Sequence, residues 1–290
     1  MVETGLIPCD ICGNAKPGVI LEPARLDGPL VECRSCGLRY VGRRRSKLAF
    51  GSETPSVVAD RVRRANADFR RLPLEEEHRL ALLNARWRVD LIRGFCNSGK
   101  LLEVGCARGD FLRVARESFD VYGVEPNPEL ADFAGLVAQV HRNVVETAPW
   151  RDFDVVTSFH VIEHVDLPRR FIAAIRERLK PGGLAVIETP NIRSLPFRIF
   201  GKHWRQFIPE HYFFFDPTTI TRLFREEGLK VERTMRIGKY ASVELIMNRL
   251  SRYLPLLSSM PRLPGLSRLT FRVDPMDIML VFATRSGNDD

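Results

Sequence analysis

Residues 101–125 contain the residue types of a nucleotide-binding turn between two strands. An apolar stretch precedes three small residues at alternate positions, and a second apolar stretch ends in Glu125. Small residues let the backbone bend sharply and approach a ligand that a Cβ would block. Glu125 follows the first of them by twenty residues, where a carboxylate can accept hydrogen bonds from ribose hydroxyls. The three small residues are Gly105, Ala107 and Gly109.

Glu103 distinguishes between two kinds of nucleotide ligand. A nicotinamide site typically has the spacing G-x-G-x-x-G and holds a pyrophosphate at a helix N-terminus. Here the small residues alternate, and a carboxylate stands two residues before the first glycine. A carboxylate at this place would repel a pyrophosphate and attract a cation. The turn therefore predicts a nucleoside ligand that carries positive charge near Glu103.

A second polar group, His160-x-x-Glu163-His164, follows the apolar stretch 153–159. After it the sequence predicts a helix over 168–178, a Lys-Pro-Gly-Gly turn and an apolar strand over 183–189. The spacing H-x-x-E-H also matches inverted zinc proteases. That chemistry needs both histidines on one regular helix, whereas His160 ends a predicted strand, so the sequence disfavours it.

Four segments between residues 99 and 191 resemble, in order, those of class I S-adenosylmethionine (SAM) methyltransferases. They are the 103–109 turn, the strand that ends in Glu125, the His160 element and the Pro-Gly-Gly strand. The resemblance implies that SAM binds at the turn, with Glu103 near its amino-acid end and Glu125 on its ribose. Ala107 stands where the family has its middle glycine. The cofactor-binding residues that we predict are Glu103, Gly105, Cys106, Ala107, Gly109, Glu125, Pro126 and His160.

Histidines are the candidates for a catalytic base. His160 is expected at the sheet edge beside the reacting methyl group and is the first candidate, followed by His164 and His211. Positioning supplies most of the rate of an in-line displacement at a sulfonium-activated carbon. A base adds to it only if the methyl acceptor is a poorly acidic hydroxyl.

A resemblance of the His160-x-x-Glu163-His164 element to another enzyme family implies a candidate metal site. Small-RNA 3′-terminal 2′-O-methyltransferases are similar here: an acid-x-x-Glu-His element and a further histidine hold a divalent metal. By position this resemblance implies a site at His160, Glu163, His164 and His211, with His160 in place of an acid. Ubiquinone-pathway O-methyltransferases also carry a Glu-x-x-Glu-His element. Imidazole in place of a carboxylate favours an ion softer than magnesium. The alternative is that Glu163 and His164 only shape the turn and cap the next helix.

Four of the six cysteines have the spacing of a zinc site. Two C-x-x-C pairs are separated by twenty residues, and a glycine follows each pair, which allows two tight turns to point their thiolates at one ion. Four protein ligands leave no open position for water, so this zinc would be structural. The predicted ligands are Cys9, Cys12, Cys33 and Cys36.

The chain divides into three predicted parts. Residues 1–42 form a zinc ribbon, 43–98 a basic linker with an amphipathic helix, and 99–290 the methyltransferase domain. Alternating strands and helices in the third part predict an α/β fold with a mostly parallel sheet. The resemblance implies a Rossmann-like seven-stranded sheet with helices on both faces and an antiparallel last strand. Residues 191–215 and 240–272 do not fit the alternation and are predicted insertions that cover the substrate.

Composition and charge limit the function. The chain has 290 residues and a net charge of +8, no secretion signal and no apolar run of 18 residues, so we expect a cytoplasmic protein without a transmembrane segment. Basic, apolar residues 240–272 are also compatible with peripheral membrane contact. The sequence favours O-methylation of a small-molecule or glycan-type acceptor. Alternatives are an RNA methyltransferase that grips phosphates through the ribbon and linker, and an interaction protein with an inactive SAM fold.

Overall fold

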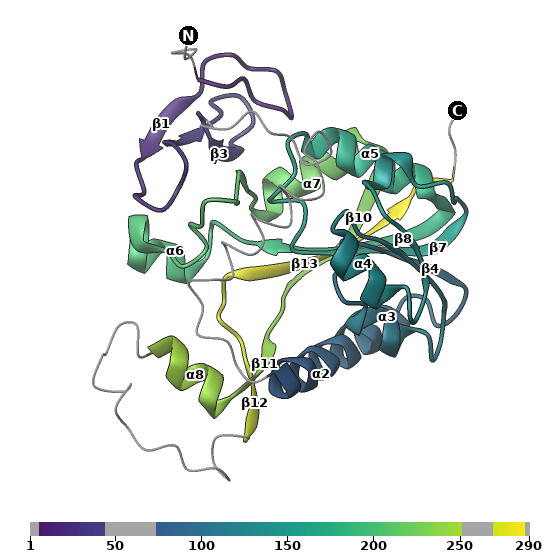
Figure 1. Ribbon diagram of the computed structural model, residues 1–290. Coiled ribbons are helices and arrows are strands. Elements are labelled where there is room, and N and C mark those ends of the chain that lie inside the picture. The colour runs from purple at the N-terminus through teal and green to yellow at the C-terminus, as the bar shows by residue number, and fades with distance from the viewer. Residues whose placement is uncertain (1–5, 44–73, 251–268, 288–290) are drawn as a thin grey trace.

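The computed structural model describes residues 6–43, 74–250 and 269–287. A seven-stranded sheet forms its centre, with the strand order β10-β13-β8-β7-β4-β5-β6 (Figure 1). The five strands β8, β7, β4, β5 and β6 are parallel, and β13 is antiparallel to both of its neighbours, β8 and β10. The predicted α/β methyltransferase sheet is thereby confirmed. The strands are β4 (Lys100–Val104), β5 (Asp120–Val124), β6 (Gln139–His141), β7 (Phe153–Phe159), β8 (Leu179–Pro190), β10 (Leu229–Arg236) and β13 (Ile278–Arg285).

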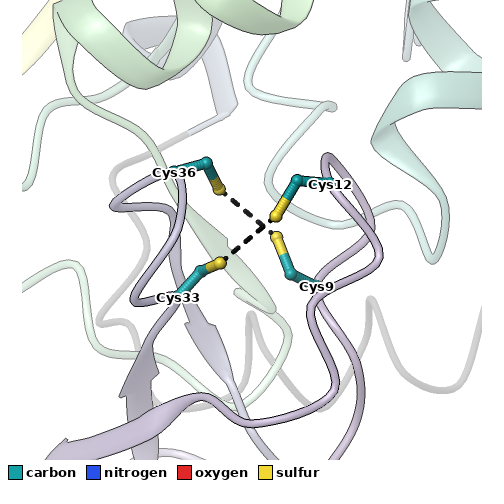
Figure 2. Close-up of side chains that lie close together, drawn as sticks. All are labelled: Cys9, Cys12, Cys33 and Cys36. Carbon is teal, nitrogen blue, oxygen red and sulfur yellow. Dashed lines mark hydrogen bonds between the residues drawn. The ribbon is translucent and has the colours of Figure 1, made fainter.

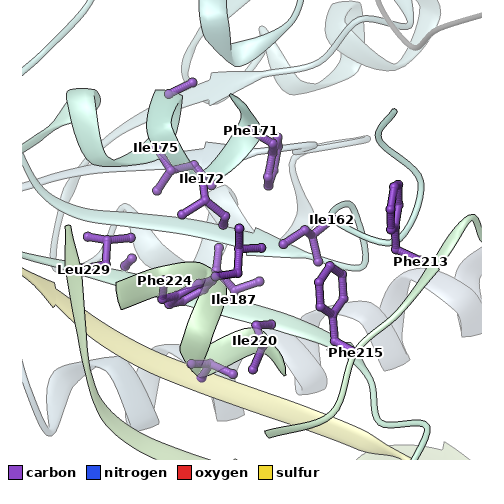
Figure 3. Close-up of a cluster of buried hydrophobic side chains, with 14 of the residues drawn as sticks. Ile162, Phe171, Ile172, Ile175, Ile187, Phe213, Phe215, Ile220, Phe224 and Leu229 are labelled. Carbon is purple, nitrogen blue, oxygen red and sulfur yellow. The ribbon is translucent and has the colours of Figure 1, made fainter. Parts of the chain in front are cut away.

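Helices cover both faces of this sheet. One face packs against α5 (Pro168–Arg178) and α7 (Pro217–Glu226) through side chains such as Phe171 and Phe224 (Figure 3). The other face packs against α2 (Leu74–Arg93) and α3 (Asp110–Ala115). A further helix, α4 (Pro128–Ala134), follows β5, and the short 3₁₀ turn η1 (Val145–Thr147) precedes β7. Ligands of such sheets bind at the carboxyl ends of the parallel strands.

The N-terminal cysteines lie in turns and loops beside a separate small sheet, ordered β1-β2-β3-β9. Three of its strands are close together in the chain: β1 (Gly18–Leu21), β2 (Leu30–Glu32) and β3 (Arg39–Val41). The fourth, β9 (Phe213–Phe214), comes from the segment that follows β8. We call residues 6–43 the cysteine module; it lies beside α6 and α7 (Figure 1).

Residues 191–215 fold against the cysteine module. They contain α6 (Leu195–Phe200), the 3₁₀ turn η2 (Gly201–His203) and β9. The Trp204 side chain is fully buried, and its Nε1 donates to Asp277 Oδ2 at 3.0 Å. Trp204 and Phe207 pack with Leu30 and Val41 of the module. These aromatic side chains therefore build a core that joins the segment to the module.

A two-stranded ribbon lies at the two ends of the second predicted insertion, residues 240–272. Its strands are β11 (Lys239–Ser242) and β12 (Thr270–Val273), and α8 (Val243–Leu250) follows β11. Asn84 of α2 fixes β11, because its side chain accepts from the Tyr240 N–H at 2.8 Å and donates to the Tyr240 carbonyl at 3.2 Å. Residues 251–268, on which the predicted membrane contact also depends, lie outside the described residues, as does most of the basic linker. None of the described helices has the length and apolar character needed to cross a membrane.

Candidate active site and cysteine cluster

The turn at residues 105–109 has the sharply bent, left-handed backbone that its small residues predict. Gly105, Ala107 and Gly109 have φ values of 78°, 47° and 77°. The N–H groups of Gly105 and Cys106 both donate to the Val124 carbonyl, at 2.8 and 3.1 Å. The sharp bend is therefore present at the carboxyl ends of β4 and β5.

The glycines are required by contacts within the chain. A Cβ on Gly105 would lie 2.5 Å from Val161 Cγ2, and one on Gly109 would lie 3.0 Å from the Ala134 Cα. We expected the missing side chains to make room for the ligand. In the structure they make room for the loop after β7 and for α4. Cys106 is buried with its Sγ against Gly123, and burial raises the pKa of its thiol.

Glu103 is a buried carboxylate with an unpartnered oxygen. Only 5% of the residue is exposed, and its Oε2 has no hydrogen-bond partner among the described residues. Burial raises the pKa of Glu103 to about 8; nearby Arg88 opposes the shift and Glu125 adds to it. A buried acceptor without a donor fits a cationic amino group at this place.

Glu125 supports the turn from the end of β5. Its two oxygens accept from the N–H groups of Ala107 and Asn127, both at 2.9 Å. Burial raises the pKa of Glu125, and these two hydrogen bonds oppose the shift. Pro126, which is half-buried, leads to Asn127, the N-cap of α4. A carboxylate oxygen has two acceptor sites, so each oxygen can still accept from a ribose hydroxyl.

His160 lies at the carboxyl end of β7 in a left-handed conformation, with φ of 58°. Its Nδ1 is 3.0 Å from Glu163 Oε1 and its Nε2 is 2.8 Å from Glu188 Oε1. The Lys239 ammonium lies 2.7 Å from the same Nε2. Burial and Lys239 act to lower the pKa of His160, but the two carboxylates outweigh them and raise it.

Three charged residues at this edge were not predicted. Arg88 of α2 donates to both oxygens of Glu188, at 2.8 and 3.0 Å, while Lys239 of β11 lies 3.1 Å from Glu188 Oε1. The Glu188 side chain is fully buried, and the cations around it hold its pKa well below the usual range. One sequence signal was available, because Glu188 is an acid within the apolar stretch of β8.

Glu163, His164 and His211 form a compact group. Their ligand atoms all lie within 4.8 Å of one another, and the two histidine rings meet edge to face at 4.6 Å. His164 Nδ1 is 2.9 Å from the Glu210 carbonyl and His211 Nδ1 is 2.8 Å from the Gln206 carbonyl. Because a carbonyl only accepts, both Nδ1 atoms carry the proton and both Nε2 atoms keep a lone pair. Such orientation by a carbonyl is typical of metal-ligating histidines.

Charge in this group follows from burial. Burial lowers the pKa of His164, and it lowers that of His211 to about 3. Burial acts to raise the pKa of Glu163, but the hydrogen bond to His160 and the nearby imidazoles lower it to about 2. His160 does not belong to this group, because Glu163 engages its Nδ1 and the Glu188 and Lys239 pair engages its Nε2. Two neutral imidazoles and one carboxylate thus converge.

The four predicted zinc ligands converge in the cysteine module, as Figure 2 shows. The Sγ atoms of Cys9 and Cys36 are 3.4 Å apart, as are those of Cys12 and Cys33. Gly13 and Gly37 have φ of 71° and 76°, and each donates its N–H at 2.8 Å to the carbonyl of the first cysteine of its pair. Four sulfurs that lie within 4.8 Å of one another fit a zinc ion with bonds of about 2.3 Å.

Relatives of known description match about half of the chain. The ubiquinone biosynthesis O-methyltransferase of Cereibacter sphaeroides is 33% identical over 147 residues, which are 45% of this chain and 60% of the relative. The enzyme of the same description from Acinetobacter baylyi is 28% identical over 174 residues, 53% of this chain and 73% of the relative. The chain thus spans about 60% of the length of the Cereibacter protein that it matches.

Solved structures with the same fold have low sequence identity. A complex of the Trm112 methyltransferase activator with a methyltransferase from Haloferax volcanii matches with a TM-score of 0.54 and 15% identity, over 82% of this chain and 100% of that chain. Magnesium protoporphyrin IX methyltransferase from Synechocystis matches with a TM-score of 0.52 and 14% identity, over 80% and 96% of the two chains. The family model described as a methyltransferase domain matches residues 60–234. Since that match covers more than half of the chain and the fold agrees with it, the chain belongs to the class I SAM-dependent methyltransferases.

Proposed function

We propose that the chain transfers the methyl group of SAM to a hydroxyl oxygen of a small molecule. The contact between Gly105 and Val161 carries the proposal, because it places the histidine loop directly on the turn that would bind SAM. The relatives described as ubiquinone biosynthesis O-methyltransferases support oxygen as the acceptor atom. Aromatic or sugar hydroxyls are poorly acidic, so this reaction benefits from a base.

Glu103 and Glu125 are the residues that would hold SAM. The unpartnered Oε2 of Glu103 would accept from the α-ammonium group, and Glu125 would accept from the ribose hydroxyls. SAM supplies a methyl group already activated by its sulfonium. The polypeptide contributes orientation, which is worth about 7–11 kcal/mol for a well-aligned displacement.

His160 is the base in this proposal. Glu163 fixes its ring through Nδ1, and Nε2 is the atom that would take the hydroxyl proton as the oxygen–methyl bond forms. An acceptor that reaches Nε2 would displace both Glu188 Oε1 and the Lys239 ammonium from it, and these two groups keep the ion pair with each other. His164 and His211, also predicted as bases, are suited to another role, because burial lowers their pKa values and their ring nitrogens converge with the Glu163 carboxylate.

Glu163, His164 and His211 would hold a divalent cation. The two Nε2 lone pairs and one carboxylate are the donors of a zinc or iron site more than of a magnesium site. A cation there would lower the pKa of a hydroxyl that reaches it. The chain's own residues still orient the acceptor and receive its proton.

The test is methyl transfer from methyl-labelled SAM to a panel of acceptors. The panel contains catechols and phenols, free and nucleotide-linked sugars, and mixed RNA. We expect label on a small hydroxyl compound, and His160→Gln should reduce kcat by about 10²- to 10⁴-fold. Transfer to RNA alone would contradict the small-molecule acceptor. Full activity of His160→Gln would contradict its role as base.

Metal content gives a separate test of the histidine group. Wild-type protein should bind one more zinc or cobalt ion per chain than the His164→Ala and His211→Ala variants. Equal stoichiometry in all three would show that these residues hold no cation.

A further inference from the structure

The cysteine module is bonded to the histidine group through a continuous set of backbone contacts. Its second cysteine pair forms the turn between β2 and β3: the Cys33 N–H donates to the Leu38 carbonyl and the Gly37 N–H to the Cys33 carbonyl, both at 2.8 Å. The segment that leads to the first cysteine pair is bonded to β3, because the Tyr40 hydroxyl of this strand donates to the Ile7 carbonyl at 2.8 Å. An ion held by the four thiolates would therefore fix β3.

The β3 strand in turn holds β9. Tyr40 pairs with Phe213 and Arg39 with Phe214 in antiparallel register. The Val41 N–H donates to the Tyr212 carbonyl at 2.8 Å, and the Tyr40 and Phe213 rings stack with centroids 6.1 Å apart. A strand of two residues has few ladder bonds of its own, so β9 depends on this partner.

The residues just before β9 meet the loop after β7. The Tyr212 N–H donates to the Glu163 carbonyl at 2.8 Å, and the Phe213 N–H donates to it at 3.2 Å. In the opposite direction, His164 Nδ1 donates to the Glu210 carbonyl. Tyr212 is thus bonded to the module on one side and to Glu163 on the other, and His211 is its neighbour in the chain.

We propose that the cysteine module is a positioning element for the histidine group: a bound zinc fixes β3, β3 fixes β9, and β9 keeps His211 against Glu163 and His164. Among these contacts, the one nearest to His211 in the chain is the hydrogen bond from the Val41 N–H to the Tyr212 carbonyl. The hydrogen bonds that shape the SAM turn run between residues 105 and 125 and involve no residue of the cysteine module. Loss of the contact should therefore displace His211 and leave SAM binding intact.

The variant Val41→Pro tests this inference. Proline removes the N–H that donates to Tyr212 and retains every cysteine. Ile20→Pro is the matched control, because Ile20 lies in the irregular part of β1, at the outer edge of the same sheet, and is 43% exposed. Both variants should keep zinc in the cysteine cluster and bind SAM with the affinity of the wild type.

The decisive readout is the ring N–H signals of His164 and His211 in protein labelled with ¹⁵N-histidine. Val41→Pro should shift or abolish both signals and reduce kcat by about 10²-fold, as a displacement of about 1 Å can. The signals of His78 and His141 should not change, and Ile20→Pro should resemble the wild type. Cys33→Ser, which removes one predicted zinc ligand and leaves Glu163, His164 and His211 unchanged, should reproduce the effect of Val41→Pro, and this keeps the test decisive if that variant does not fold.

Two results would overturn the inference. One is an unchanged pair of His164 and His211 signals in Cys33→Ser or in Val41→Pro. The other is loss of SAM binding together with these signals, because the module would then support the whole domain and not the histidine group. Since the ring signals are recorded without an acceptor, their outcome is separate from that of the acceptor panel.

Discussion

Val161 occupies the space that a side chain on Gly105 would need, with its Cγ2 2.5 Å from the ideal Cβ position. The loop that carries His160, Glu163 and His164 therefore rests on the turn that follows β4. Through this contact, a change in the turn also moves the candidate catalytic residues. The same contact explains why only glycine fits at position 105.

The first prediction concerns this contact. Gly105→Ala should lower the free energy of unfolding by about 1–3 kcal/mol, because it combines a clash with a left-handed backbone, and it should weaken SAM binding. The double variant Gly105→Ala, Val161→Ala should recover part of the stability, since only the clash is relieved. Denaturant unfolding measures both. Equal stability of the single and double variants would show that Val161 does not limit the site.

Ala107 provides the opposite test in the same turn. It is a non-glycine residue with φ of 47°, a conformation that costs an L-residue about 1–2 kcal/mol. Ala107→Gly relieves this strain but adds about 0.4–1 kcal/mol of unfolded-state entropy. The variant should be as stable as the wild type or more stable by about 1 kcal/mol. A clear loss of stability would indicate that the alanine methyl group makes a favourable contact.

Glu103 should make the stability of the free protein depend on pH. Burial raises its pKa from 4.5 to about 8, so between these values the folded chain keeps a proton that the unfolded chain releases. Stability of the ligand-free protein should therefore fall as pH rises through this range, and Glu103→Gln should be more stable at pH values above it. Thermal unfolding as a function of pH measures the difference. If the melting temperatures of the wild type and Glu103→Gln changed with pH in the same way, the raised pKa of Glu103 would be contradicted.

SAM binding should favour the ionised form of Glu103, whereas the ligand-free protein favours the protonated form. An ammonium group beside Glu103 favours the carboxylate, so below about pH 8 binding should release a proton from Glu103. Calorimetry in buffers of different ionisation enthalpy detects this proton. The Glu103→Gln variant should lack the contribution.

Glu188 is predicted to be the most sensitive charge at the sheet edge. Glu188→Gln leaves the partly exposed Arg88 and Lys239 without their shared carboxylate and should cost about 3 kcal/mol, the lower end of the range for a buried pair. Glu117→Gln is the matched control, because Glu117 pairs with Arg86 on the surface, where the side chains are about half exposed. That change should cost less than about 1 kcal/mol. If both variants lost a similar free energy of unfolding, the Glu188 network would not contribute more to stability than a surface ion pair.

The sequence predicted the parts whose signals are local. The alternation of strands and helices predicted the α/β fold, the resemblance implied its seven strands, and the glycine positions predicted the turn after β4. The spacing of Cys9, Cys12, Cys33 and Cys36 predicted their cluster, because each pair is shaped by its own tight turn.

Contacts between distant segments were not predictable in this way. Arg88 and Lys239 are single charges on a helix and a short strand, and only the tertiary fold brings them to Glu188. The pairing of β3 with β9 involves two residues of each strand, too short for a periodic pattern. Trp204 was expected in a substrate cover, but its ring is buried against Leu30 and Val41 of a module that the sequence treats separately.

The most direct test of the account is a calorimetric titration of the purified chain with SAM. We predict one binding site per chain, weakened by Glu103→Ala and by Glu125→Ala and unaffected by Glu117→Ala on the surface. Absence of detectable binding at millimolar SAM, or wild-type affinity in both site variants, would contradict the assignment of the 105–109 turn as the SAM site.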